Sequence, residues 1–433
     1  MFAKGPALLV IASLATVADV PAAAAQQTSS AAEQQQARDP QATEAQEPER
    51  ASGRKRTGLK GWFRQRLEAP PKPVTDPGGG FSPTAGTVVS GSGLAAGGKY
   101  KSVNLLPGGI DAQVSGMVSL RGYQEYSAAI GWMDRDRSTV ALDTADTAIG
   151  SLFNAGSPKA RGMAGYVEVR HRFYPLQRYF GPGATTRHED RSDYTLSGTS
   201  VDGVLQRQLT PKVGVSVRGG WLRLQAGAGH DDTTPDVGDR FAFSNLAGLA
   251  QQPAFVTLGA GIAWDARNNP RAPEDGWFTA TSLRHFAPLS QSADAFTRAT
   301  IELRGYRRAP GGVVAARGLT SADLGGSATP FFLQASLGGA QTLRGFGNYR
   351  FSDRAVAHGT VEYRWRVHRY FEITPFVDAG TVAHSWARLA AGDIEVTPGI
   401  GLRGRTDHRV FGRIDWSHSR EGHRLVLGVG PAF

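Results

Sequence analysis

The chain has 433 residues, no cysteine, 55 glycines and a formal charge of +10, and 40% of its residues are hydrophobic. The absence of cysteine excludes a disulfide-stapled fold and thiolate chemistry. After residue 25, no stretch approaches the roughly 18 consecutive apolar residues of a membrane helix, so a membrane-spanning protein with this sequence must be a closed β-barrel. The basic residues are spread along the chain, which favours a polar lumen in anionic surroundings over a nucleic-acid partner.

Residues 1–25 predict a signal peptide that is removed on export. Lys4 precedes the apolar run PALLVIASLATV, which is too short to cross a bilayer as a helix. The small residues at 23–25 stand before Gln26, as at a signal-peptidase site. Together with the strand pattern described below, export predicts a place in the outer membrane of a Gram-negative cell.

Residues 26–80 predict a periplasmic linker without a folded domain. Residues 26–52 are rich in Gln, Ala and Glu and hold almost no large apolar side chain, which predicts disorder. In the basic stretch that follows, four apolar residues fall on one helical face and predict a short amphipathic helix over 55–68: Leu59, Trp62, Phe63 and Leu67. A basic linker that is only partly helical is the alternative. Proline and glycine in PPKPVTDPGGG then exclude regular structure up to the barrel.

From residue 81 to 433 the pattern has a period of two, which predicts an all-β fold and an outer-membrane barrel. In RATIELRGY and TVEYRWRVH, apolar residues alternate with charged or polar ones. A soluble sandwich also alternates, but repeated charges on one face, flanked by Trp and Tyr, suit a wide barrel with a hydrated interior and aromatic girdles. At about 20 to 22 residues for each strand with its loop, the segment holds close to sixteen antiparallel strands.

Four short motifs follow one another along this predicted barrel. They are DARNNPRAPEDGW (Asp265–Trp277), LRGF (Leu343–Phe346), VEYR (Val361–Arg364) and FVDAG (Phe376–Gly380). Together with the C-terminal phenylalanine, they resemble the motifs of the BamA/TamA-type outer-membrane assembly and two-partner secretion superfamily, the bacterial surface antigen family. LRGF is similar to that family's sixth surface loop, VEYR to its twelfth strand and FVDAG to its thirteenth.

The resemblance implies that the loop around LRGF folds back into the barrel and is locked there. Arg344 would then bind the inward carboxylates of Glu362 and Asp378, because an unpaired buried charge costs several kcal/mol and one guanidinium can contact two carboxylates. Gly345 would let the backbone turn close to the wall, and Phe346 would add aromatic packing. The alternative is an exposed Arg344, with Glu362 in a plain lumen ion pair.

Two further sets of residues belong to the periplasmic side of the predicted barrel. The family's periplasmic turn corresponds here to Asp265, Arg267, Asn269, Pro270 and Gly276. In the last strand, four residues are expected on one face and resemble the signal that the outer-membrane assembly machinery reads: Leu425, Leu427, Val429 and Phe433. This machinery is therefore an expected partner during biogenesis.

The resemblance implies a function in membrane transit, namely assisting the insertion or translocation of unfolded proteins, or of lipids, at the outer membrane. Outer-membrane lipids and lipopolysaccharide are then expected contacts. Family members that assemble or secrete proteins usually carry POTRA domains before the barrel, whereas about 55 residues stand here between the signal peptide and the barrel, which predicts a barrel-only member. This departure leaves a passive pore or structural barrel, without insertase activity, as the alternative.

The sequence predicts no enzyme, cofactor or metal site. Neither G-x-S-x-G nor H-E-x-x-H occurs. The nearest group of reactive residues is DWSHSREGH, in which Ser417 and His418 are neighbours on one strand and must point to opposite faces. An outer-membrane hydrolase that depends on Ser417 or His423 is the remaining enzymatic alternative.

Overall fold

The computed structural model describes residues 79–433, except 90, 133–162, 242–245, 271, 292, 390–393, 407–409 and 429. These residues belong to one compact unit. The predicted signal peptide and linker, with the helix expected over 55–68, lie outside the described residues. Within the described ranges, none of the helices has the length and apolar content needed to cross a membrane.

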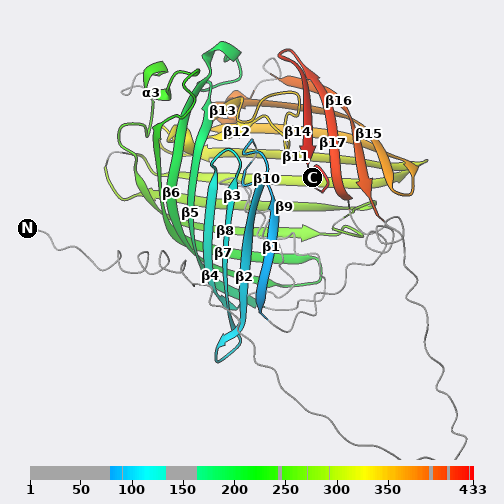
Figure 1. The fold of residues 1–433 in the computed structure, drawn as a ribbon, viewed down its shortest axis with the longest axis horizontal. Coiled ribbons are helices and arrows are strands. Elements are labelled where there is room, and N and C mark those ends of the chain that lie inside the picture. Colours follow the sequence, from blue (N-terminus) through cyan, green and yellow to red (C-terminus); the bar gives the residue numbers. More distant parts are fainter. Residues whose placement is uncertain are drawn as a thin grey trace, which may run out of the picture. The chain divides into compact units, whose positions relative to one another are not determined.

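Sixteen strands form one antiparallel sheet that follows chain order, from β1 to β11 and then from β14 to β18 (Figure 1). They are β1 (Gly80–Gly86), β2 (Ala95–Leu106), β3 (Ile110–Ser119), β4 (Gln124–Trp132), β5 (Met163–Tyr179), β6 (Ser192–Gln208), β7 (Val213–Ala228), β8 (Ala254–Asp265), β9 (Gly276–Pro288), β10 (Phe296–Ala309), β11 (Gly312–Leu324), β14 (Ala355–His368), β15 (Phe371–Ala383), β16 (Glu395–Arg405), β17 (Val410–Ser419) and β18 (Gly422–Gly428). The predicted transmembrane β-barrel of about sixteen strands is confirmed.

Two short strands lie within the connection from β11 to β14. They are β12 (Ala335–Leu337) and β13 (Phe351–Asp353), which pair only with each other. Because they stand outside the large sheet, β14 is the twelfth strand of the barrel and β15 the thirteenth, as the VEYR and FVDAG motifs predicted. We call the end of the barrel that holds this connection the outer end. The opposite end, where β1 begins and β18 finishes, is the periplasmic end.

Exposure alternates along the strands in the sense that a membrane barrel requires. On β10, Ile301 and Leu303 are 39% and 53% exposed, whereas Arg298 and Glu302 are buried. Val361 on β14 is likewise exposed. Large apolar side chains on the outside and buried charges on the inside are the reverse of a soluble sandwich, and they place the lipid on the outer face.

Aromatic side chains fill the lumen near the outer end. Phe331, in the connection between β11 and β14, packs edge-on against Tyr194 and Tyr179, with ring centroids 4.9 and 5.2 Å apart. Phe286 and Phe296 stack at 4.6 Å on neighbouring strands. All five rings are buried. This part of the barrel is therefore a packed core rather than an open channel.

The two ends of the sheet order, β1 and β18, form what we call the seam. No ladder joins these strands within the described residues. Both are short, with seven residues each. Their outward-facing edges therefore carry backbone N–H and C=O groups without a partner strand in the described sheet.

The chain leaves the wall after β18 and turns into the lumen. Phe433 is only 8% exposed and packs against Tyr306 of β10, with ring centroids 6.2 Å apart. Leu425 and Leu427, in contrast, are 62% and 70% exposed on the outer face. The expectation that Phe433 shares their face is wrong. The strand ends at Gly428, and Pro431, which has no N–H for a ladder, follows it, so the alternation of faces does not continue to Phe433. Val429, the fourth residue of that expectation, lies outside the described residues.

Candidate functional site

The connection between β11 and β14, residues 325–354, folds back into the barrel, and we call it the clasp loop. Its interior is an apolar cluster in which Leu337, Leu343, Phe346 and Phe351 are all at most 1% exposed. The rings of Phe346 and Phe351 meet edge-on at 5.0 Å. Phe346 thus has the packing that the sequence predicted.

Gly345 lies against the barrel wall where a side chain would not fit. A Cβ atom at this position would be 2.8 Å from Thr397 Cγ2 and 2.9 Å from the backbone oxygen of His418. Ser419 Oγ also donates a hydrogen bond to the Gly345 carbonyl at 2.9 Å. The glycine is needed for this close approach to β16 and β17.

Arg344 is the centre of the site. Its Nε and Nη2 donate to the two carboxylate oxygens of Asp378 at 2.9 and 2.7 Å, and its Nη1 donates to Glu362 Oε1 at 2.9 Å. The backbone N–H of Arg344 also donates to Asp378 Oδ2 at 3.1 Å. The guanidinium lies 3.3 Å from the ring centroid of Phe376 and is 2% exposed. The predicted contacts of Arg344 with Glu362 and Asp378 are therefore present, and the exposed alternative is not.

Three charged residues that the sequence analysis did not assign to the site complete it. Arg403 Nη2 donates to Glu362 Oε1 at 2.8 Å. Asp415 Oδ2 lies 3.5 Å from Arg344 Nη1 and accepts from Arg413 Nη1 at 2.8 Å. All are buried in the lumen wall on β16 and β17. Their only sequence signal is the inward position in a period-two strand, which many lumen residues share.

The buried network holds four arginines and three carboxylates when Arg364 is included, since this residue donates to Glu362 Oε2 at 3.1 Å. We call these seven residues the clasp: Arg344, Glu362, Arg364, Asp378, Arg403, Arg413 and Asp415. Every carboxylate has an arginine within ion-pair distance. Such a network is strongly destabilised when one partner is removed, because a buried charge is left uncompensated.

The tip of the clasp loop reaches both sides of the seam. Arg424 on β18 donates from Nη2 to Asn348 Oδ1 at 3.3 Å. Gly91, in the connection between β1 and β2, packs directly against the same side chain, since a Cβ there would be 2.3 Å from Asn348 Nδ2. Asn348 is only four residues after Arg344, so the clasp fixes the residue that bridges the seam.

The predicted periplasmic turn between β8 and β9 is held by an ion pair. Arg267 Nη2 and Nε donate to Asp265 at 2.7 and 2.9 Å, and Arg267 Nη1 donates to the Pro270 carbonyl at 3.5 Å. Gly276 has φ 97° and would place a Cβ 2.2 Å from a backbone oxygen. The side chain that caps the turn is that of Asn268, whose Oδ1 accepts hydrogen bonds from two backbone N–H groups. The residue named in the sequence analysis is its neighbour, Asn269.

Glu274 of this turn, which the sequence analysis did not single out, crosses the periplasmic mouth. Its carboxylate contacts Arg366 on β14 and lies 3.4 Å from Arg405 Nη2 on β16. Arg405 also donates to Glu372 at 2.8 Å. These contacts join turns that are distant in the chain, so the local sequence could not reveal them.

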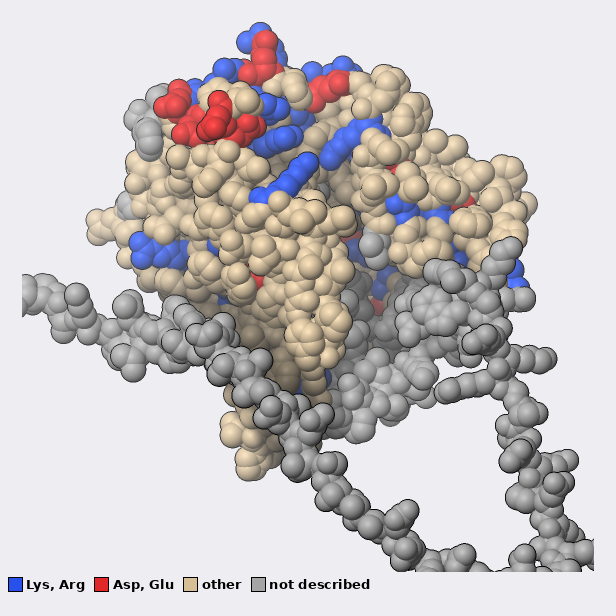
Figure 2. Space-filling view, in the orientation of Figure 1, with Lys and Arg blue, Asp and Glu red and all other residues tan. Residues whose placement is uncertain are grey.

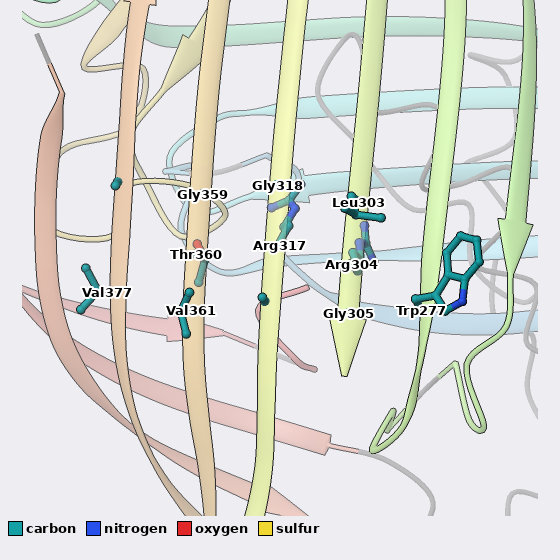
Figure 3. Close-up of a pocket in the computed structure, with 12 residues that line it drawn as sticks. Trp277, Leu303, Arg304, Gly305, Arg317, Gly318, Gly359, Thr360, Val361 and Val377 are labelled. Atoms are coloured by element: carbon teal, nitrogen blue, oxygen red, sulfur yellow. The ribbon is translucent and has the colours of Figure 1, made fainter. Parts of the chain in front are cut away.

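The outer wall near the clasp carries an apolar groove of about 770 Å³ (Figure 3). The small residues that line it are Gly305, Ala316, Gly318, Gly359 and Ala379. Four larger apolar side chains also line it: Trp277, Leu303, Val361 and Val377. Because the groove is apolar and faces the lipid, acyl chains fit it better than a polar ligand.

The residues of the hydrolase alternative do not form a catalytic group. Ser417 is fully buried on the lumen side of β17, whereas His418 is exposed on the outer face beside His423, with ring centroids 4.6 Å apart. Opposite faces of one strand separate the nucleophile from the base. In the described part of the chain, no cluster of His, Asp or Glu has the arrangement of a metal site.

Comparisons with known proteins give a family match and structures of similar fold. Residues 112–407 match the Omp85 superfamily domain. No match is found among curated proteins. The fold is similar to BamA from Haemophilus ducreyi lacking POTRA domains 1–3, at 15% identity and a TM-score of 0.55 over 80% of this chain and 68% of that one. CdiB from Acinetobacter baumannii (10% identity, TM-score 0.43) and from Escherichia coli (12%, 0.45) match 81% and 82% of this chain, and 59% of each CdiB chain is covered.

Proposed function

The chain belongs to the Omp85 superfamily, and on this premise we propose that its barrel assists the insertion or translocation of unfolded proteins at the outer membrane of a Gram-negative cell. The clasp is the observation that carries the proposal. Arg344 binds Asp378 and Glu362, and through Asn348 the same loop touches both sides of the seam. The loop therefore links the buried ion pairs of the lumen to the seam, where no ladder joins β1 and β18 in the described sheet.

The seam supplies the contact for an incoming chain. An extended segment can add to an unpaired strand edge through main-chain hydrogen bonds, and β1 and β18 have such edges in the described sheet. The short β18 lowers the number of bonds that must be broken or exchanged there. In this mechanism the protein orients and releases a β-strand, and no covalent step is involved.

A passive pore is the second candidate, and lipid transit is the third. The buried aromatic side chains at the outer end, together with the clasp loop, occupy the lumen and argue against free conduction. Lipid transit is favoured by the apolar groove on the outer wall. We propose no enzymatic activity, because Ser417 and His418 face opposite sides of the wall.

The proposal is tested by reconstituting the full chain in liposomes and measuring how fast a urea-unfolded small test barrel folds into them, by its heat-modifiable gel mobility. Arg344→Ala removes the clasp, and Arg344→Lys retains the charge without the bidentate contact. Arg170→Ala is the matched control, because it removes a lumen ion pair to Glu168 at 2.9 Å on β5, outside the clasp.

We expect wild type and Arg170→Ala to accelerate folding several-fold and Arg344→Ala to lose this effect, with Arg344→Lys in between. A wild type that is folded but gives no acceleration would overturn the insertion proposal. Planar-bilayer conductance then separates a pore, which conducts steadily, from lipid transit, which moves a labelled lipid between leaflets without conductance.

A further inference from the structure

Four arginines gather at the outer end of the barrel, beside the seam, and only Arg424 among them has a part in the proposed insertion function, through its hydrogen bond to Asn348. They are Arg121 between β3 and β4, Arg178 near the end of β5, Arg191 directly before β6 and Arg424 on β18. We call these four the arginine cluster. Figure 2 shows basic side chains around a hollow in this part of the surface.

The positive charges of the cluster lie close enough to repel one another. Arg178 interacts electrostatically with Arg191 and Arg121, and Arg424 interacts with Arg178. The phenol of Tyr123 interacts electrostatically with Arg178 and Arg121. Grouped like charges are unfavourable in the free protein, and a bound anion relieves the repulsion.

Two of these arginines have no direct ion pair in the described part of the chain. Among the described residues, neither Arg178 nor Arg424 has a carboxylate within ion-pair distance. Arg424 donates from Nη2 to the uncharged amide of Asn348 at 3.3 Å, and its buried Nη1 has no hydrogen-bond partner. Arg121 and Arg191 donate to uncharged oxygens of neighbouring loops at 3.0 and 2.7 Å.

Acidic residues stand next to the cluster, but their own loops use them. Asp231, which interacts electrostatically with Arg178 and Arg191, accepts hydrogen bonds from two threonine hydroxyls at 2.6 and 2.9 Å. Asp236 accepts from a backbone N–H at 2.7 Å, and Asp190 pairs with Arg240 at 3.0 Å. Each of these carboxylates thus has hydrogen-bond donors within its own loops.

A cavity adjoins the cluster and adds a donor without an acceptor. The cavity measures about 170 Å³ and is lined mainly by aromatic and aliphatic side chains, with Arg172, Gln177 and Arg178 among its polar residues. Gln177 is 4% exposed, and its Nε2 has no hydrogen-bond partner among the described residues. A buried N–H group without an acceptor is unfavourable, so this wall too is complementary to an oxygen-rich anion.

We propose that the arginine cluster is a binding site for a phosphate group, carried by a glycolipid of the outer leaflet or free in solution. The site offers N–H donors and uncompensated positive charge, which a phosphate with several acceptor oxygens can satisfy. Guanidinium groups contact phosphate in a bidentate manner, and the cluster contains arginine alone. The site lies outside the clasp and shares only Arg424 with the seam contact, so phosphate binding can be measured separately from insertion.

The test uses the full chain in two settings. In detergent micelles, inorganic phosphate is titrated by calorimetry. In nanodiscs, a phosphate-bearing glycolipid is compared with its dephosphorylated form. The variants are Arg178→Gln, Arg424→Gln and the double variant, and Arg388→Gln is the matched control, because Arg388 is an exposed arginine of the loop between β15 and β16 outside the cluster.

We expect each single variant to weaken phosphate binding roughly tenfold or more, the double variant to abolish it and the control to bind like wild type. Folding of each variant is checked by heat-modifiable mobility, and Arg178→Lys should retain part of the affinity. Preference for the phosphorylated glycolipid would identify the lipid as the source, whereas binding of free phosphate alone would identify the soluble anion. Equal binding by wild type and the folded double variant, or none by either, would overturn the proposal.

Discussion

Replacing Arg344 by alanine is expected to destabilise the barrel by about 3–5 kcal/mol, because one partner of a buried ion pair is removed. The loss is not shared equally. Glu362 keeps two other arginines, at 3.1 and 2.8 Å, whereas Asp378 keeps no cation, only two threonine hydroxyls at 2.9 and 3.4 Å and the backbone N–H of residue 344 at 3.1 Å. Most of the penalty should therefore come from the stranded carboxylate of Asp378.

This reasoning predicts strong coupling between Arg344 and Asp378. Asp378→Asn alone should cost a similar amount, and the double variant should cost less than the sum of the singles by about 1–3 kcal/mol. Urea-induced unfolding in micelles, followed by tryptophan fluorescence, gives the free energies of unfolding. Additive effects within about 0.5 kcal/mol, or a loss below about 1 kcal/mol for Arg344→Ala, would refute the assignment of the penalty to a stranded charge.

Three further substitutions test other parts of the barrel. The pKa of Glu274 lies below its ordinary value of 4.5, since burial, which opposes ionisation, is outweighed by the arginines across the periplasmic mouth. The ionised Glu274 therefore stabilises the turn fully above pH 4.5, and this stabilisation is lost as the pH falls through the lowered pKa. In wild type, hydrogen-exchange protection of the turn should decrease over that acid range, and in Glu274→Gln this decrease should be absent. The same pH profile in both proteins would contradict the prediction. Gly345→Ala, with a Cβ 2.8 Å from Thr397, should lower the free energy of unfolding by about 1–3 kcal/mol, whereas Gly347→Ala, with nothing within 4 Å, should leave it nearly unchanged; equal effects would disprove the steric argument. Phe433→Ala should lower the free energy of unfolding of the refolded protein by about 3 kcal/mol. A variant as stable as wild type would contradict the packing of Phe433 in the lumen. The amount of the variant assembled in the outer membrane of cells, measured separately, tests the predicted assembly signal.

Sequence reasoning identified the clasp because its central residues stand in short motifs with fixed spacing. An exposed turn does not require an arginine between leucine and glycine, so Arg344 stood out in the sequence. Glu362 and Asp378 occupy inward positions on two strands with a period of two. Arg403 and Asp415 were not identified, although they sit on equally regular strands. A period of two shows which face a side chain occupies, but not which side chains meet across the lumen.

The end of the chain shows where the strand pattern stops predicting the position of a side chain. Leu425 and Leu427 follow the strand pattern, and the structure places them outward as that pattern requires. Phe433 is beyond the last paired residue of β18, so the alternation that predicts its neighbours no longer applies. Its position depends on a contact with Tyr306, which is more than one hundred residues earlier in the chain.

The contacts at the two ends of the clasp loop differ in burial and charge, and on the proposed insertion function this difference predicts which contact breaks first. Arg344 is fixed by buried charge-assisted hydrogen bonds, whose loss costs about 3–5 kcal/mol. At the seam, Asn348 is only partly buried, and its Oδ1 accepts a long hydrogen bond of 3.3 Å from Arg424 Nη2, a contact worth no more than about 1.5–3 kcal/mol. On the proposed insertion function, a client strand that enters the seam is therefore expected to displace Asn348 before it disturbs the clasp. The ion pairs of Arg344 with β14 and β15 should then persist while the edges of β1 and β18 separate.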